Sequence, residues 1–519
     1  MQEYIQNPII KELHEKIENH YNKSEYEEAI LIIDSVVRQD TYIESTLKNY
    51  AVVDFASHYI EIADYIRVEN SNLALKLVCK AIGILNHKAA SVPEMQLLIL
   101  CNIARAHLIK YDIKHIEKAN DEGMSILTFS YDNTIFGIKE DVSQAISNYW
   151  LAMKEINEGD ELYNIRNNLS NALARVGRFV EAIALFNDNV TEFPERWESR
   201  ASFSDALLNI VDSSIMQRTP SLYYAVAEGY VSSLRHDLNN GIRNTIEQNL
   251  NICKFYLQNT DLPFDYDNIL KNRIEENNEF DQHSDFRKFV LKNHLSLNEH
   301  AIFCKCKNSS KDDLRIGLKA GSSHFSALGV MPKLDGLINR LVSEFSFARL
   351  QYYNYIKDLV KFEDDVEYSI LSNFDICGYK IEQLRLSYRL SYSILDKIAN
   401  GVIDLSDIQR NGRVSYFENV FDMYKEELKY VFNIHLSSLY SISLDLNKDQ
   451  GSLRFFKRLR NEMEHGFLAV NESQGVKNSV VSVSENELRE FTFDLLKLTR
   501  AAIFSFTFFI RTQTIHTYG

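Results

Sequence analysis

The chain has few of the residues that break helices. Its 519 residues include only 6 prolines and 18 glycines. Because these two residues interrupt helices and mark turns between strands, their scarcity favours long helices with short connections over a sheet-rich fold. Hydrophobic residues make up 45% of the chain and charged residues 25%, which is typical of a folded globular protein. The length is sufficient for about three domains.

Long hydrophobic runs are also missing. The longest one, residues 501–510, stands between Arg500 and Arg511 and has about half the length that a membrane-spanning helix needs. The first residues, MQEYIQNPIIKEL, lack the basic and apolar segments of a secretory signal. We therefore expect a cytoplasmic protein with no membrane partner.

Positive charge is in deficit, with a formal net charge of -15 at pH 7. Sequence-independent binding of nucleic acid depends on many contacts between phosphates and Lys or Arg, so the deficit argues against a broad surface of that kind. A small and locally basic RNA site remains compatible with it.

Cysteine is sparse and scattered. Among six cysteines only Cys304 and Cys306 are close in sequence, and no second pair at zinc spacing accompanies them. Buried thiols in a reducing compartment are the favoured interpretation over a metal site. We predict no metal and no cofactor.

Residues 163–196 have the pattern of two paired helices. The helices are expected to meet at Gly177 and Arg178, and Pro194 closes the unit. Small or apolar residues recur on both sides of the turn, at Leu169, Ala172, Leu173, Phe179, Ala182, Ile183 and Phe186. The stretch resembles one tetratricopeptide (TPR) repeat, although Arg166 and Asn189 depart from that pattern.

Weaker patterns of the same kind occur at residues 24–30 and 70–75, at irregular intervals. We therefore predict a degenerate TPR-like solenoid of helical pairs over residues 1–215, with a peptide or protein partner on its concave face. A helical bundle with accidental repeat matches is the alternative.

The rest of the chain is also expected to be helical, so the predicted fold class is all-α. Residues 216–336 are interpreted as a helical connector with irregular loops, and residues 337–519 as a helical bundle. A capping box at residues 484–487 predicts the start of the last helix, which continues to about Arg511. Further helices of this bundle are expected at 338–360, 381–402 (ending near Asn400 and Gly401), 416–432, 435–446 and 452–470.

The segment 452–470 places four polar residues in one sector of its helix. At 100° per residue, Arg460, Asn461, Glu464 and His465 fall within 140° of one another. The apolar residues form a separate stripe beside them, made by Phe456, Leu459, Met463, Phe467 and Val470. The stripe anchors the helix and leaves its polar edge exposed.

An Arg followed by a His five to seven places later is weak evidence alone, because about two such pairs are expected by chance. Arg287 with His294, Arg511 with His516 and Arg458 with His465 also fit the spacing. A structural alternative stays open, in which Glu464 pairs with Arg460 and His465 is half-buried.

The bundle with its Arg460-Asn461-x-x-x-His465 motif resembles the HEPN superfamily, many of whose members cut RNA without a metal ion. The resemblance covers about residues 337–519, and the arrangement of the whole chain is similar to that of bacterial proteins with a TPR-like front half. It implies that Arg460, Asn461 and His465 are catalytic. A histidine can exchange protons near neutral pH, and an arginine can bind two phosphate oxygens at once. Glu464, Arg458, Lys457 and Arg454 are supporting or RNA-binding candidates.

The leading hypothesis is therefore a metal-independent endoribonuclease that cuts RNA by 2'-hydroxyl transesterification at a composite homodimer site. The resemblance implies a role in antiviral defence or as a toxin. The main alternative is a non-catalytic interaction scaffold that dimerises through the bundle, and a weaker one is nucleotide binding by the bundle.

Overall fold

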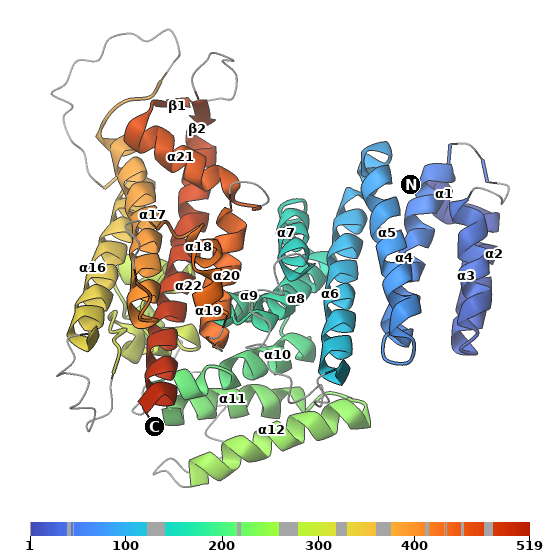
Figure 1. The fold of residues 1–519 in the computed structure, drawn as a ribbon, viewed down its shortest axis with the longest axis horizontal. Coiled ribbons are helices and arrows are strands. Elements are labelled where there is room, and N and C mark those ends of the chain that lie inside the picture. The colour runs from blue at the N-terminus through green and yellow to red at the C-terminus, as the bar shows by residue number, and fades with distance from the viewer. Residues whose placement is uncertain are drawn as a thin grey trace. The chain divides into compact units, whose positions relative to one another are not determined.

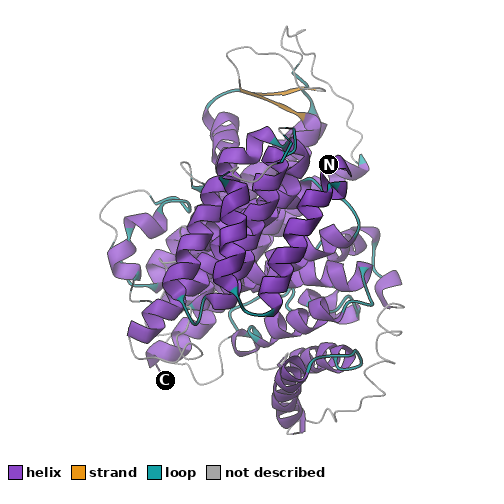
Figure 2. Ribbon diagram, turned by 90° about the vertical axis from the view of Figure 1, so that its right-hand side faces the viewer, coloured by secondary structure: helices purple, strands orange, loops and turns teal. Residues whose placement is uncertain are grey.

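The computed structural model describes residues 2–38, 43–44, 46–121, 141–214, 219–258, 279–317, 330–359, 375–409, 415–429, 431, 433–447, 451–471 and 481–518. Helices dominate these ranges (Figures 1 and 2), which confirms the all-α fold class. None of the helices in these ranges is long and apolar enough to cross a membrane.

The chain forms two compact units, Met1–Ala172 and Leu173–Gly519. This division lies within one helix, Asp160–Arg175, and does not coincide with the boundaries at residues 215 and 336 that the sequence suggested. Residues 259–278 of the predicted connector lie outside the described residues.

The first unit is a succession of helices, each packed mainly on its neighbours in sequence. Asparagine side chains cap two of its helices: Asn7 accepts a hydrogen bond from the backbone N–H of Ile9, and Asn70 from that of Leu73. Whether these helical pairs are TPR repeats stays a prediction. The helices are α1 (Gln2–Gln6), α2 (Pro8–Asn22), α3 (Tyr26–Val37), α4 (Lys48–Ile66), α5 (Ser71–Lys88), α6 (Gln96–Asp121), α7 (Asp141–Lys154) and the start of α8 (Asp160–Arg175), with short 3-10 turns η1 (Ala89–Ser91) and η2 (Pro93–Met95).

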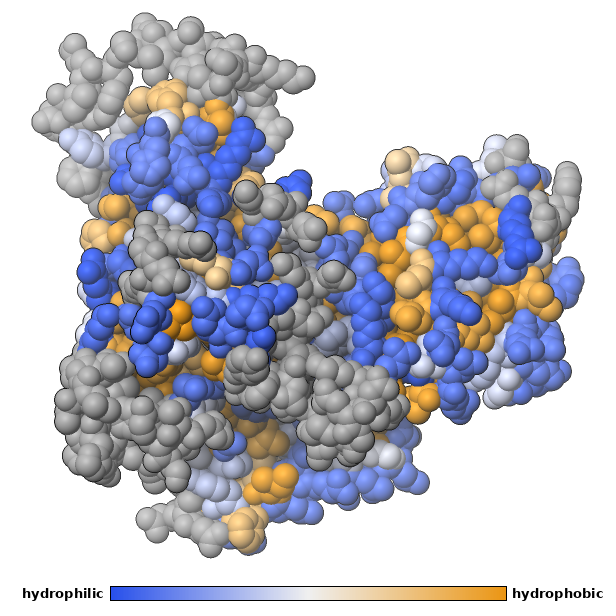
Figure 3. Space-filling model, viewed as in Figure 1, coloured by the Kyte–Doolittle hydropathy of each residue, from blue (hydrophilic) through white to orange (hydrophobic). Residues whose placement is uncertain are grey.

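Apolar surface remains on the outside of this unit (Figure 3). Leu31, Tyr65 and Val68 are among its most exposed large hydrophobic residues, each about two-thirds exposed.

The second unit begins with a further set of helices and an irregular segment. Between α8 and α9 the chain turns at Gly177, whose φ of +79° is favourable only for glycine, and a Cβ there would lie 2.3 Å from the carbonyl oxygen of Ile434. The elements are α9 (Phe179–Glu192), α10 (Trp197–Leu208), η4 (Val211–Ser213), α11 (Thr219–Ser233), α12 (Asn240–Gln258), α14 (Asp285–Lys292), η5 (His300–Ile302) and η6 (Lys307–Ser309).

A helical bundle completes the second unit. The long helix α22 packs against α16, α17 and α20, while α21 contacts α17 and α20 near the end of the bundle that carries the two strands (Figure 1). The strands β1 and β2 pair in parallel. The elements are α16 (Val330–Lys357), α17 (Tyr379–Leu405), α18 (Val420–Met423), α19 (Lys425–Leu428), α20 (Ile434–Leu446), α21 (Arg454–His465), β1 (Leu468–Asn471), β2 (Val481–Ser484) and α22 (Glu485–Tyr518).

The predicted capping box is confirmed. The Ser484 hydroxyl accepts from the backbone N–H of Glu487 at 3.2 Å, and the Glu487 carboxylate accepts from the backbone N–H of Ser484 at 2.9 Å. The helix that it opens continues to Tyr518, beyond the predicted end at Arg511.

Three expectations for this bundle were wrong. Helix α17 does not end near Gly401 but continues to Leu405. Glycine is needed there for space, because a Cβ would lie 2.3 Å from Cζ of Phe506 on α22. The segment 416–432 forms only the short helices α18 and α19 instead of one helix, and the helix expected over 452–470 ends at His465, after which the chain enters β1.

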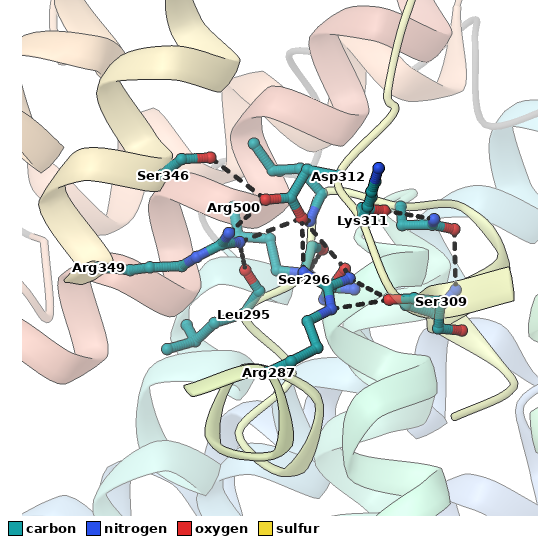
Figure 4. A network of polar contacts seen from close by, with 12 residues as sticks. Arg287, Leu295, Ser296, Ser309, Lys311, Asp312, Ser346, Arg349 and Arg500 are labelled. Carbon is teal, nitrogen blue, oxygen red and sulfur yellow. Dashed lines mark hydrogen bonds and ion pairs between the residues drawn. The ribbon is translucent and has the colours of Figure 1, made fainter. Parts of the chain in front are cut away.

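Buried charges connect the irregular segment to the bundle (Figure 4). Arg287 of α14 and Arg349 of α16 both donate to Asp312. Oδ1 of Asp312 also accepts from the backbone N–H of Leu297 at 2.8 Å. Burial alone would raise the pKa of Asp312, but Arg349 and then Arg287 hold it well below its usual range. On α22, Arg500 donates to the Ser296 carbonyl at 2.8 Å. The segment 285–317 is therefore joined to α16 and α22 through buried polar contacts.

Candidate functional site at helix α21

Helix α21 is fixed to the bundle through one apolar face. Phe456 and Leu459 are buried, and the ring centre of Phe455 lies 4.5 Å from that of Phe491 on α22. The Tyr388 hydroxyl on α17 donates to the Phe456 carbonyl at 2.8 Å. Phe467 does not continue this stripe, because it follows the end of the helix and is 49% exposed. The anchored part of the helix is thus its N-terminal two-thirds.

Arg460 lies next to this apolar face of α21 and is half-buried against α17. Its Nη1 donates to Oδ1 of the neighbouring Asn461 at 3.1 Å. Its Nη2 lies 3.5 Å from Oδ2 of Asp396, and its guanidinium carbon lies 5.8 Å from the ring centre of Tyr392. Three contacts therefore orient the guanidinium of Arg460. One of them is the hydrogen bond that the Asn461 side chain accepts.

Asp396 is a functional candidate that the sequence did not reveal. Its Oδ1 accepts from the backbone N–H of Phe417 at 3.1 Å. Burial, together with the negative charge of Glu418, raises the pKa of Asp396 to about 6, although the Phe417 hydrogen bond, Arg460 and Lys457 oppose the shift. The sequence separation of Asp396 from Arg460 gives no signal, since only the packing of α17 on α21 brings them together.

His465 is the last residue of α21 and is exposed. Within the ranges that the structure describes, no side chain forms a hydrogen bond or ion pair with it. Along an α-helix it lies about 7.5 Å beyond Arg460 and is rotated by about 140°. A phosphate bound to Arg460 is therefore not placed within hydrogen-bond distance of His465 of the same helix by the helix geometry alone.

The supporting candidates divide into engaged and free side chains. Glu464 accepts from Nε of Arg389 on α17 at 2.9 Å, so it does not pair with Arg460 as the structural alternative supposed. Lys457 forms an ion pair with the buried Glu418 and is not available as a free cation. Arg454 and Arg458 are exposed, and their guanidinium groups make no ion pair with another described residue.

The other Arg and His pairs of similar spacing have structural roles. Arg287 is 7% exposed within the Asp312 network, and Arg511 is 6% exposed and donates to Glu299 at 2.8 Å. His294 has a left-handed backbone, with φ of 52°, and lies 3.1 Å from Asp188. The side chain of His516 lies outside the described residues.

His435 has a structural role in the interior of the second unit. Its Nε2 lies 2.5 Å from the Ser213 hydroxyl, and burial, helped by Arg511, lowers the pKa of the imidazole to about 3. A histidine that stays neutral in the interior cannot exchange protons near neutral pH.

A family model for the LA2681-like HEPN domain matches residues 325–513. Residues 325–513 are a HEPN domain. The match includes the bundle helices α16, α17 and α20, all of α21 and most of α22. Comparisons with curated proteins and with solved structures give no match to the chain.

HEPN domains commonly bind RNA and dimerise, and many are ribonucleases, while others have nucleotide-binding functions. In the HEPN domain of this chain, the polar edge of α21 offers an oriented guanidinium at Arg460, an exposed imidazole at His465 and two exposed arginines at Arg454 and Arg458. These groups can bind phosphate and transfer protons.

Proposed function

We propose that the HEPN domain is an endoribonuclease whose catalytic residues are Arg460, Asn461 and His465. The observation that carries the proposal is the difference between the surroundings of Arg460 and those of His465. Arg460 is oriented by three contacts, whereas His465, five residues later, is exposed with both ring nitrogens free of described partners. RNA cleavage through the 2'-hydroxyl needs both a fixed phosphate-binding group and a group that transfers protons.

The chemical step divides between these groups. In the transition state the phosphate carries additional negative charge on its non-bridging oxygens, and the Arg460 guanidinium can donate two parallel hydrogen bonds to them. His465 can remove the proton from the attacking 2'-hydroxyl, or protonate the departing 5'-oxygen, since an imidazole can act as a general base or as a general acid. Arg454 and Arg458 would attract the neighbouring phosphates.

A single α21 offers one such imidazole, whereas cleavage needs a base and an acid. We therefore propose a homodimer in which two α21 polar edges face one another across a twofold axis. Each edge would then supply one Arg460 and one His465 to a shared phosphate. The exposure of His465, Arg454 and Arg458 supports this arrangement, because these side chains remain available for a partner and for RNA.

One specific observation favours the scaffold alternative. The two cations nearest the interior of the site are already paired, Arg460 with Asp396 and Lys457 with Glu418. If RNA cannot compete with Asp396 for Arg460, the HEPN domain would only dimerise. The role of the first unit as a partner-binding solenoid, and a role of the whole chain in cytoplasmic defence or as a toxin, are parts of the same proposal.

The test is cleavage of single-stranded RNA and of tRNA by the purified full-length protein in the presence of EDTA. We expect products that end in a 2',3'-cyclic phosphate or a 3'-phosphate, because the 2'-oxygen is the nucleophile. Circular dichroism after the same incubation checks that the chelator leaves the fold intact. An absolute need for a divalent ion in an intact protein, or products ending in a 3'-hydroxyl, would exclude this mechanism.

A further inference from the structure

Two cysteines and one histidine meet in the irregular segment between α14 and α16. The segment brings Cys304 and Cys306 together with His300, which stands four residues before the first cysteine. The two sulfur atoms and one imidazole nitrogen all lie within 4.8 Å of one another. Nε2 of His300 is 3.1 Å from Sγ of Cys306. The cysteines are 4% and 7% exposed, so the cluster faces the interior.

The backbone around the cluster is fixed by side chains that are themselves buried. Asn298, 1% exposed, accepts from the backbone N–H of His300 at 2.8 Å and donates to the Lys311 carbonyl at 2.6 Å. The buried Ser309 hydroxyl donates to the Cys304 carbonyl at 2.7 Å. These contacts hold the three ligand-bearing residues in place without regular secondary structure.

A second layer of contacts acts on the ligand atoms and on their carbonyls. The backbone N–H of Cys306 points to Sγ of Cys304 at 3.2 Å, a contact that stabilises a thiolate. His283 donates from Nε2 to the carbonyls of Lys305 and Cys306, at 3.1 and 3.2 Å.

The spacing suits a tetrahedral zinc ion. With Zn–S near 2.3 Å and Zn–N near 2.0–2.1 Å, ligand atoms in such a site are separated by about 3.5–3.8 Å. The distances between the three ligand atoms here are already within about 1 Å of that separation. Two thiolates and a neutral imidazole are the donors that zinc prefers, and they are unsuited to calcium or magnesium.

We propose that His300, Cys304 and Cys306 bind one zinc ion, with water or another ligand in the fourth position. The ion would fasten the segment that supports α22 from outside the HEPN domain. In that segment the Ser296 carbonyl accepts from Arg500, and Glu299 accepts from Arg511. The site is structural in this inference, and it does not depend on the proposed ribonuclease function.

The experiment measures metal in the full-length protein, purified under reducing conditions without chelator. Elemental analysis is expected to find about one zinc per chain in the wild type and less than a tenth of that in the Cys304→Ser/Cys306→Ser variant. The exposed cysteines offer a matched control, Cys79→Ser/Cys377→Ser, which is expected to keep the metal. Equal zinc in the wild type and the Cys304→Ser/Cys306→Ser variant would overturn the site.

A second measurement covers the case in which that variant fails to fold. Cobalt(II) added to metal-stripped wild-type protein is expected to give ligand-field bands of a tetrahedral site and a thiolate-to-cobalt charge-transfer band, which zinc then removes. Zinc is also expected to raise the Tm of the stripped wild type by about 3 °C or more. Absence of the charge-transfer band, or a Cys304–Cys306 disulfide in protein prepared with zinc present, would overturn the proposal.

Discussion

Arg178 and Asp445 form an ion pair inside the second unit, with Nη1 of the arginine 2.5 Å from Oδ2 of the aspartate. Their side chains are only 1% and 2% exposed, and 267 residues separate them in sequence. Arg178 precedes α9, and Asp445 is in α20 of the HEPN domain. The guanidinium also contacts Glu181 at 2.7 Å. The HEPN domain thus contains a buried carboxylate whose partner comes from outside residues 325–513.

Replacing Arg178 tests the importance of that pair. Arg178→Met should lower the free energy of unfolding by about 3–5 kcal/mol, because it leaves Asp445 buried without its cation. Arg340→Met is the matched control: Arg340 also pairs with a glutamate, but it is 66% exposed, so a change below about 1 kcal/mol is expected. Chemical denaturation of both variants measures the difference. Equal effects would show that burial of the pair contributes nothing.

The same pair predicts where the chain can be shortened. A fragment of residues 216–519 lacks Arg178 and also α9, which packs on α22, so we expect it to be unfolded or insoluble. A fragment of residues 160–519 keeps these elements and should unfold cooperatively. Circular dichroism and size-exclusion chromatography distinguish the two outcomes. A stable, cooperative 216–519 fragment would restore the boundary near residue 215 that the helical repeats suggested.

The proposed catalytic residues predict a separation of activity from folding. Arg460→Ala and His465→Ala should each reduce RNA cleavage at least about 100-fold while the Tm and the dimer remain largely unchanged. Arg235→Ala and His236→Ala are suitable controls, because they lie next to one another outside the HEPN domain and Arg235 is exposed. Cleavage rates and light scattering report the two properties. Undiminished cleavage by His465→Ala would favour the scaffold.

Gly401 predicts a position where one methyl group is not tolerated. Gly401→Ala should destabilise the second unit by about 2–4 kcal/mol, because the new Cβ would lie 2.3 Å from Phe506 and 2.9 Å from Leu337. The control is Gly336→Ala in α16, where nothing lies within 4 Å of the new Cβ, and a gain of about 0.5–1 kcal/mol is expected from helix propensity. Thermal unfolding compares the two. A neutral Gly401→Ala would mean that α17 and α22 can move apart without cost.

Asp396 predicts a pH dependence of stability. Its folded-state pKa of about 6 lies above the ordinary value near 3.9, so the folded protein binds this proton more tightly than the unfolded chain. The resulting stability is complete below about pH 4 and is lost as the pH rises to about 6, by at most about 3 kcal/mol. Asp396→Asn does not titrate and should lack this loss. Unfolding free energies of both proteins between pH 4 and 7 test it, and parallel curves would contradict the assignment.

The sequence alone determined the local features of this protein. Scarce proline and glycine predicted helices, and the Ser484–Glu487 spacing fixed the start of α22, because a capping box involves only residues three apart. The polar edge of α21 could also be predicted from the sequence, since Arg460, Asn461 and His465 belong to one helix. All of these depend on short-range geometry, which the order of residues specifies directly.

Only the tertiary structure decided what surrounds those residues. Asp396 lies beside Arg460, and Asp445 beside Arg178, because separate helices pack together, and no periodicity in the sequence encodes which carboxylate meets which cation. Gly401 looked like the end of a helix, but it lies inside α17, where Phe506 of α22 leaves no room for a Cβ. His300 joins Cys304 and Cys306 through a loop without a repeating pattern. Contacts of this kind depend on the packing of distant segments, which sequence spacing does not specify.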